Sequence, residues 1–386
     1  MQANYTTPSV PSTLPFTIPE RVLAKKGSKP GVLTAYSLEE TRDYLRSMAK
    51  LQEAEDYDRS LDQLHISFIG GTAKGRFLNR SGIAGEEMLL TSAGASDLAG
   101  EVLPSRFFAG LKELAQTDEQ GAKLATMTWA KFAQKATTPK MVRTVKMQVN
   151  GQTHRAIRSC HSPTYAPYSH LQFVEDMLDN AGEFAKLPVL DFRVTDSAMR
   201  LRFAGCDAGE IEVNKPITMI EAWNSEIGSR KVGLRGGMWR LTCTNGMGNW
   251  DNRSDFAWRH SGDSGRIQNG VRNAFENLLT SARGIVEAYG QALSIGIDDA
   301  FAFMEQELQK GEATARFIVE AQGALQHATT TPGGNLASVV DAITLVAHMT
   351  TEDLQVQFEM ENLASGILRR GLTTGLRNGG RIEVGV

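Results

Sequence analysis

Hydrophobic residues recur along this chain in two patterns, one typical of helices and one typical of strands. Apolar residues follow the 3.6-residue helical spacing most clearly from Ile267 to Tyr289, and a shorter helical pattern covers residues 167–182. From Leu190 to Phe203 apolar and polar residues alternate, and Thr195–Ala198 supplies turn residues, so this segment predicts a β-hairpin. Residues 216–246 predict two further strands, and residues 298–370 predict mainly helices.

Local signals mark where several of these elements begin and end. Ser37 followed by Glu40 forms a capping-box pattern, which predicts the start of a helix in the stretch 37–64. Asn150–Gly151 favours a tight turn that closes a basic strand over residues 140–149. Asn245–Gly246 is read in the same way, as a turn at the end of the strand that begins near Met238.

The order of helix, strands and long helix predicts an α+β fold, in which an antiparallel sheet of hairpins is backed by a long helix. A helical C-terminal region follows the sheet. The proline-rich N-terminus predicts a mobile arm, because five of the chain's 12 prolines fall there. We therefore divide the chain into an arm, a mixed α/β region, an α+β core domain and a helical C-terminal region, with these boundaries: 1–35, 36–135, 136–297 and 298–386.

Composition narrows the class of protein. With 386 residues the chain can form two or three domains, and its three cysteines are too few for a disulfide framework, which fits a reducing cytoplasm. No apolar run is long enough to cross a membrane, and the polar N-terminus shows no signal-peptide pattern. We expect a cytoplasmic protein of a bacterial host cell, without a membrane partner.

Charge is segregated although the net charge is only -3. Three stretches without acidic residues, 120–174, 227–250 and 362–382, carry 16 basic residues. Basic segments of this kind can follow a phosphate backbone, and nearby aromatic rings can stack on bases. The alternative is that these cations meet acidic residues of the same protein. The candidate nucleic-acid-binding residues are Lys140, Arg143, Lys146, Arg155, Arg158, Arg230, Lys231, Arg235 and Arg240.

Motifs for catalysis or metal binding are weak. Cys243 lies on the apolar side of its predicted strand, which favours a small buried side chain over a nucleophile. The histidines and cysteines lack zinc-site spacing. The glycine-rich stretch at Gly70 lacks the G-K-[ST] ending and the following apolar helix of a phosphate loop. Asp191 and the neighbouring acids suit a solvated sheet face better than a metal-dependent nuclease. We predict no catalytic residue, metal or cofactor, and the question of enzymatic activity stays open.

Two sequence blocks resemble the phage- and plasmid-associated domain-of-unknown-function family 932. That family's pattern has N-S-E-x-G, then R-L-x-C-x-N-G, and the chain shows "WNSEIGSRKVGL", "WRLTCTNGM" and a downstream Arg259–His260. The resemblance covers roughly residues 155–370 and implies a role on mobile elements. The strand and helix order is also similar to RecT and Red-beta single-strand annealing recombinases. The motif residues are Asn224, Ser225, Glu226, Gly228, Cys243, Asn245 and Gly246.

The sequence thus leaves three functions of different classes. The first is a homo-oligomeric protein that binds and anneals single-stranded DNA, assists recombination and hydrolyses no nucleotide. The second is an oligomeric assembly or scaffolding protein of a phage or plasmid system. The third is a metal-dependent nuclease.

Overall fold

The structure, a computed structural model, confirms the α+β class. Antiparallel strands, a long helix and a helical C-terminal region are all present. The structure describes residues 37–69, 72–78, 85–103, 105–149, 151–181, 188–194, 198–206, 215–242, 245–250, 256–262, 264–328, 334–349 and 354–384. The predicted N-terminal arm and Cys243 lie outside these residues.

An N-terminal lobe is built on a six-stranded sheet in the order β1-β5-β6-β4-β3-β2, which is antiparallel except for the β4–β6 pair. Helices α2 to α4 cover one face, where the fully buried Trp129 packs with Phe108 in the lobe's apolar core. The elements are β1 (Glu55–Ser60), a 3-10 turn (Leu61–Gln63), β2 (Leu64–Ile69), β3 (Thr72–Phe77), β4 (Met88–Leu90), α2 (Ser92–Val102), α3 (Ser105–Thr117), α4 (Glu119–Ala133), β5 (Pro139–Val149) and β6 (Gln152–His161).

The central sheet is an antiparallel meander in the order β11-β10-β9-β8-β7, and β12 also pairs with β10. One face carries Met199, Leu201 and Phe203 and packs against α6, α5 and α1. The opposite face carries arginines at the alternate positions of β8. The elements are α1 (Leu38–Gln52), α5 (His170–Ala181), β7 (Val189–Val194), β8 (Met199–Ala204), β9 (Pro216–Asn224), β10 (Val232–Thr242), β11 (Asn245–Trp250), β12 (Phe256–Trp258) and α6 (Ser264–Ala292).

A C-terminal bundle completes the fold. Its core joins the end of α6 to four further helices. Two of them, α7 and α9, begin at side-chain caps where Asp299 and Asn335 accept backbone N–H groups. Strands β13 and β14 form a short parallel pair beside the bundle. The elements are β13 (Gly296–Ile297), α7 (Ala300–Lys310), α8 (Ala315–Ala328), α9 (Leu336–Met349), α10 (Leu354–Arg377) and β14 (Arg381–Ile382).

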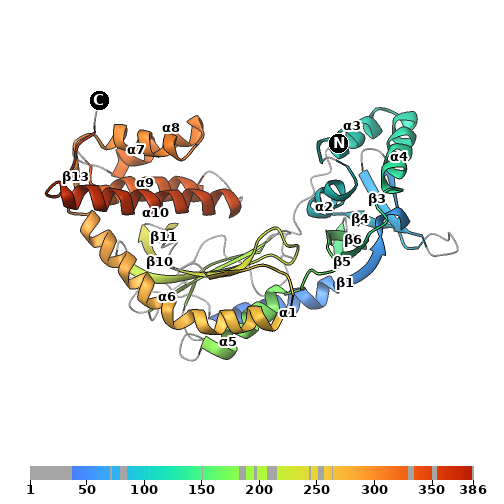
Figure 1. The fold of residues 1–386 in the computed structure, drawn as a ribbon, viewed down its shortest axis with the longest axis horizontal. Coiled ribbons are helices and arrows are strands. Elements are labelled where there is room, and N and C mark those ends of the chain that lie inside the picture. The colour runs from blue at the N-terminus through green and yellow to red at the C-terminus, as the bar shows by residue number, and fades with distance from the viewer. Residues whose placement is uncertain are drawn as a thin grey trace.

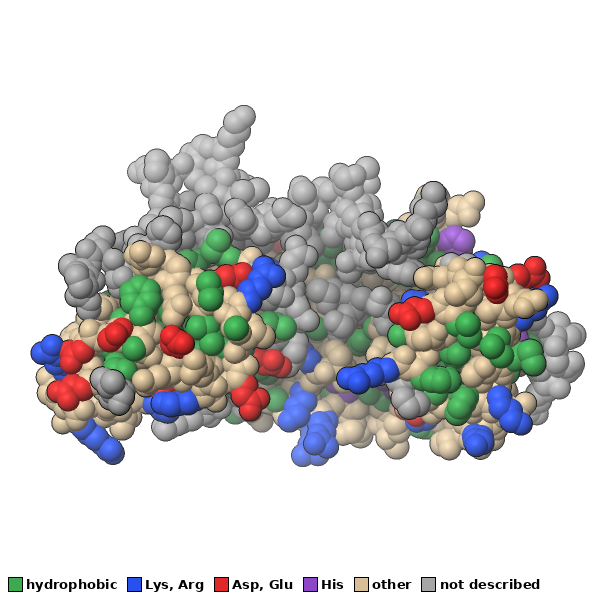
Figure 2. Space-filling model, turned by 90° about the horizontal axis from the view of Figure 1, so that it is seen from above, with side chains coloured by type: hydrophobic (Ala, Val, Ile, Leu, Met, Phe, Trp, Pro, Cys, Tyr) green, Lys and Arg blue, Asp and Glu red, His purple; other side chains and the backbone are tan. Residues whose placement is uncertain are grey.

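The molecule is curved, with the central sheet and α6 at its base (Figure 1). The N-terminal lobe rises at one end and the C-terminal bundle at the other, and α10 lies on the inner side of the central sheet. Seen from above, both ends expose hydrophobic side chains among charged ones (Figure 2). In the part of the chain that the structure describes, no helix is long and apolar enough to cross a membrane.

Three expectations need correction. The hairpin β5–β6 belongs to the N-terminal sheet, so the predicted boundary at residue 135 divides strands that pair with β1 and β4. Residues 55–60 form a strand that was not expected from their pattern, because all but Tyr57 are polar. Asn245 and Gly246 lie in β11 opposite Thr242 and Leu241, so the chain reverses before them.

Candidate functional site

Seven of the nine predicted nucleic-acid-binding residues make ion pairs within the chain. The pairs are Lys140–Glu101 (2.6 Å), Arg143–Asp56 (2.8 Å), Lys146–Glu53 (2.5 Å), Arg155–Glu55 (3.0 Å), Arg158–Glu226 (2.6 Å), Arg235–Glu221 (2.7 Å) and Arg240–Asp341. In each pair the acidic residue lies in a different segment of the sequence from the basic residue. Counting the charges along one segment therefore does not reveal the pairing. For these seven residues the structure shows the alternative that the sequence left open, in which the cations meet acidic residues of the same protein, and binding of nucleic acid by any of the nine stays a prediction.

Arg230 and Lys231 directly precede β10. The Arg230 guanidinium lies 4.6 Å from the centroid of the Phe358 ring on α10. Lys231 is exposed. Arg259 is exposed as well, and it follows Trp258, which pairs with Val232, so Arg259 comes next to Lys231 across the β10–β12 edge. We call Arg230, Lys231 and Arg259 the edge cations.

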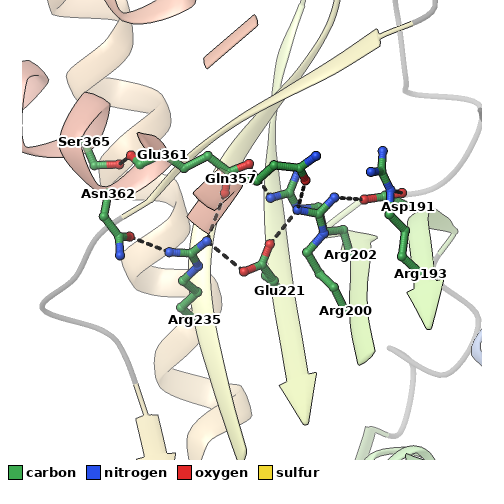
Figure 3. Close-up of polar contacts among 10 residues, drawn as sticks. All are labelled: Asp191, Arg193, Arg200, Arg202, Glu221, Arg235, Gln357, Glu361, Asn362 and Ser365. Carbon is green, nitrogen blue, oxygen red and sulfur yellow. Dashed lines mark hydrogen bonds and ion pairs between the residues drawn. The ribbon is translucent and has the colours of Figure 1, made fainter. Parts of the chain in front are cut away.

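The inner face of the central sheet carries three buried arginines, which we call the arginine face: Arg200, Arg202 and Arg235 (Figure 3). Arg202 lies beside Glu221 in the sheet register, and Glu221 lies beside Arg235 on the next strand. The Arg202 Nε donates to Glu221 at 2.6 Å. Because the side chains of alternate residues share one face of a strand, the three arginines all point away from α6 and toward α10.

Helix α10 covers this face and supplies acceptors. Glu361 bridges two strands, since one carboxylate oxygen lies 2.5 Å from Arg202 and the other lies 3.1 Å from Arg235. The side-chain oxygen of Gln357 accepts from the Arg200 guanidinium at 2.7 Å, and that of Asn362 accepts from the Arg235 guanidinium at 2.6 Å. The other terminal nitrogen of the Arg200 guanidinium lies 2.6 Å from the Asp191 carboxylate on β7. A carboxylate therefore occupies the fork of two arginines, which is the geometry that also holds a phosphate.

Burial sets the charge balance of this network. Burial opposes the charge of Arg202, but the Glu361 and Glu221 carboxylates outweigh it and raise the pKa of Arg202. Burial and the neighbouring charge of Arg202 lower the pKa of Arg200. Buried ion pairs repay their desolvation only when the geometry is good, and removal of one partner leaves an uncompensated charge. Covering the sheet with this network therefore costs more desolvation free energy than covering it with apolar residues would.

A second set of polar side chains joins the N-terminal sheet to the central sheet, and we call it the junction cluster. Its members are Arg143, Arg158, His161, Tyr165, His170, Asn224, Ser225, Glu226, Gly228 and His260. Four of these are family-motif residues, and they follow one another at the end of β9. These four motif residues therefore share one location, where Glu226 contacts the N-terminal sheet.

Glu226 is the centre of the junction cluster. Its carboxylate accepts from the Arg158 guanidinium at 2.6 Å and from the backbone N–H of His170 at 2.7 Å. The backbone oxygen of Glu226 accepts from Arg143 at 3.1 Å. Burial raises the pKa of Glu226, but its interactions with His170 and Arg158 outweigh burial and hold the pKa at about 2. The carboxylate is thus ionised and binds β6 to α5, while the backbone oxygen of the same residue binds β5.

Three buried histidines surround this carboxylate. Tyr165 stacks between His161 and His260, with ring centroids at 4.0 Å and 5.1 Å. Burial lowers the pKa of His161 and of His170 to about 4 each, and it also lowers the pKa of His260, so the rings are neutral at pH 7. The side-chain amide of Asn224 donates to the Nδ1 atom of His170 at 3.2 Å, which places the proton of His170 on Nε2.

Neither group forms a metal site. Among the described residues, no set of three histidine, cysteine or carboxylate side chains could hold a metal ion. Asp191, one of the acids considered for a nuclease, is paired with Arg193 and Arg200. The remaining motif residues, Asn245 and Gly246, lie in β11 on the far side of β10 from β9.

No protein-family model, curated protein or solved structure matches this chain. The resemblance to family 932 and to annealing recombinases therefore stays a prediction.

Proposed function

We propose that the protein binds single-stranded nucleic acid, as an annealing-type recombination protein that hydrolyses no nucleotide. The antiparallel meander followed by the 29-residue helix α6 has the element order of annealing recombinases. Fold likeness alone does not carry a function. The proposal therefore depends on the chemistry at the start of β10.

Cations and aromatic rings alternate at that position. The Arg235 guanidinium lies 4.1 Å from the centroid of the Phe358 ring, and Arg230 lies over the same ring. Trp223 packs edge-on against Phe358 at 5.5 Å. Beyond them lie the exposed Lys231 and Arg259. Single-strand sites combine cations for the backbone with rings on which bases stack. Trp223 and Arg235 are buried, so the support for a single-stranded ligand comes from the exposed Lys231 and Arg259, which its phosphates would meet.

The test is fluorescence anisotropy with labelled single-stranded and double-stranded oligonucleotides over a range of salt concentrations. Each phosphate contact on a single strand contributes about -0.7 to the slope of log affinity against log salt. The double variant Lys231→Ala/Arg259→Ala should therefore make the slope shallower by about 1.4. The matched control is Lys50→Ala/Arg283→Ala, which removes one lysine and one arginine from exposed positions on α1 and α6.

The control variant should bind like the parent protein. Equal effects of both double variants would show a nonspecific charge effect and no site at β10. If the parent protein binds no oligonucleotide at low salt, the nucleic-acid function is wrong. The assembly function then takes its place, and the exposed apolar side chains at both ends of the molecule are the observation that favours it.

A further inference from the structure

Helix α4 presents an apolar stripe to solvent. Leu124 and Met127 are 54% and 69% exposed, and neighbouring residues Lys123 and Lys131 border them on the same helix face. A groove of about 640 Å³ runs beside the stripe, between α4 and the end of β2, where Ile69 is exposed. Large exposed apolar side chains beside a groove are typical of an interaction surface. We call this surface the α4 face.

The opposite end of the molecule carries a second exposed apolar surface. Phe301 on α7 and Val319 on α8 are 40% and 66% exposed, and the two helices pack together. The acidic residues Glu305, Glu312 and Glu320 lie on or between these helices. We call this surface the α7–α8 face. Figure 1 shows it at the other end of the long axis from α4.

The segments that carry the two faces have opposite net charge, and the acids Asp118 and Glu119 also line the groove of the α4 face, where Glu119 pairs with Lys123. Residues 105–135 contain five basic and three acidic residues, a net charge of +2. Residues 298–328 contain two basic and six acidic residues, a net charge of -4. Opposite potentials favour contact between two surfaces, whereas two copies of the same surface would bring like charges together. The α7–α8 face therefore fits the α4 face better than it fits a second copy of itself.

We propose that a second copy of this chain binds head to tail, with the α4 face of one copy on the α7–α8 face of the next. Within one chain the two faces lie at opposite ends and do not meet. Such a heterologous contact repeats from copy to copy and gives a ring or a filament. The occupant of the apolar groove is then an acidic helical surface of a neighbouring copy.

The test uses two full-length variants, each with one face blocked, in sedimentation velocity without nucleic acid. Leu124→Asp/Met127→Asp places acids where the acidic face must bind. Phe301→Lys/Val319→Lys places cations where the basic face must bind. The parent protein should form species larger than a monomer, and each variant alone should be monomeric. An equimolar mixture should form a 1:1 dimer, because each variant retains one intact face that complements the other.

Thermal unfolding of each variant shows whether it remains folded, and the mixture reports assembly independently, because dimer formation requires folded partners. The proposal is overturned if the parent protein is monomeric at all concentrations. It is also overturned if the α7–α8 variant still assembles while the α4 variant does not, because that result indicates a symmetric α4–α4 contact. A failure here leaves the oligonucleotide result at β10 unaffected, since Lys231 and Arg259 are on neither face.

Discussion

At the scale of single residues, Gly228 shows why the N-S-E-x-G block ends in glycine. Its φ of +69° is in the left-handed region, and a Cβ atom would lie 3.0 Å from the Tyr165 ring. Gly228→Ala should lower the free energy of unfolding by about 2 to 3 kcal/mol, from backbone strain and from the ring contact. Urea denaturation measures this loss. Gly262→Ala is the control, because Gly262 has a φ of +80° but open space around it.

The control should lose only about 1 kcal/mol, the cost of the backbone conformation alone. An equal loss in both variants would show that Tyr165 gives way without cost. The stacking of Tyr165 between the two histidines would then not be a rigid feature of the junction cluster.

The buried histidines make stability depend on pH. Their folded-state pKa values of about 4 for His161 and His170 are below the ordinary value of 6.5. The folded state thus opposes protonation, and stability that is present above pH 6.5 is lost as the pH falls toward 4. From pH 7.5 to pH 5 each histidine should remove on the order of 2 kcal/mol. Denaturation at both pH values checks this loss.

His170→Gln should reduce that pH dependence, because glutamine does not titrate. Glu226 acts in the same direction at lower pH, since its lowered pKa contributes stability that is lost between about pH 4.5 and 2. If the variant and the parent lose the same stability between pH 7.5 and 5, His170 is not the group that is protonated on unfolding.

At the scale of elements, Glu361 holds the start of α10 on the central sheet. Glu361→Gln leaves Arg202 and Arg235 buried with less negative charge between them, so the free energy of unfolding should fall by about 3 to 5 kcal/mol. The control Glu320→Gln removes an exposed pair with Arg316 and should cost less than about 1 kcal/mol. Similar losses in the two variants, measured in urea, would contradict a strong coupling between α10 and the arginine face.

The sequence predicted those elements whose signals are local. The capping box at Ser37 is present, and the long helix begins near its predicted position and extends to Ala292. Strand β1 was missed because it shows no apolar alternation. Its acids Glu55 and Asp56 are neutralised by Arg155 and Arg143, which are far away in the sequence but lie on strands of the same sheet. Pairing between residues some 90 positions apart leaves no pattern within either segment.

The candidate sites, too, could be predicted from the sequence only where their signals are local. The sequence located Glu226 and its neighbours as a motif and located the basic stretches. It did not reveal that Arg158 is the partner of Glu226, or that α10 brings Glu361 to Arg235. The lesson is that a stretch without acids predicts an external polyanion only if other segments do not supply the acids.

At the scale of the whole molecule, the N-terminal lobe and the central sheet are joined through polar contacts at the junction cluster. Buried Arg158, 3% exposed, depends on Glu226 for its charge balance. Glu226→Gln should therefore weaken the junction by several kcal/mol while the apolar cores on either side stay intact. The N-terminal lobe and the central sheet should then unfold separately, whereas we expect them to unfold together in the parent protein.

Hydrogen exchange at increasing urea, read by mass spectrometry, distinguishes these two cases. In the Glu226→Gln variant, peptides from β5–β6 and from β9–β10 should lose protection at different urea concentrations. The control Glu87→Gln removes pairs with Lys74 and Arg76 inside the N-terminal lobe and does not touch the junction. That control should keep a single transition. A single transition in both variants would mean that helix α1, which packs on the central sheet and leads into β1, couples the lobes without Glu226.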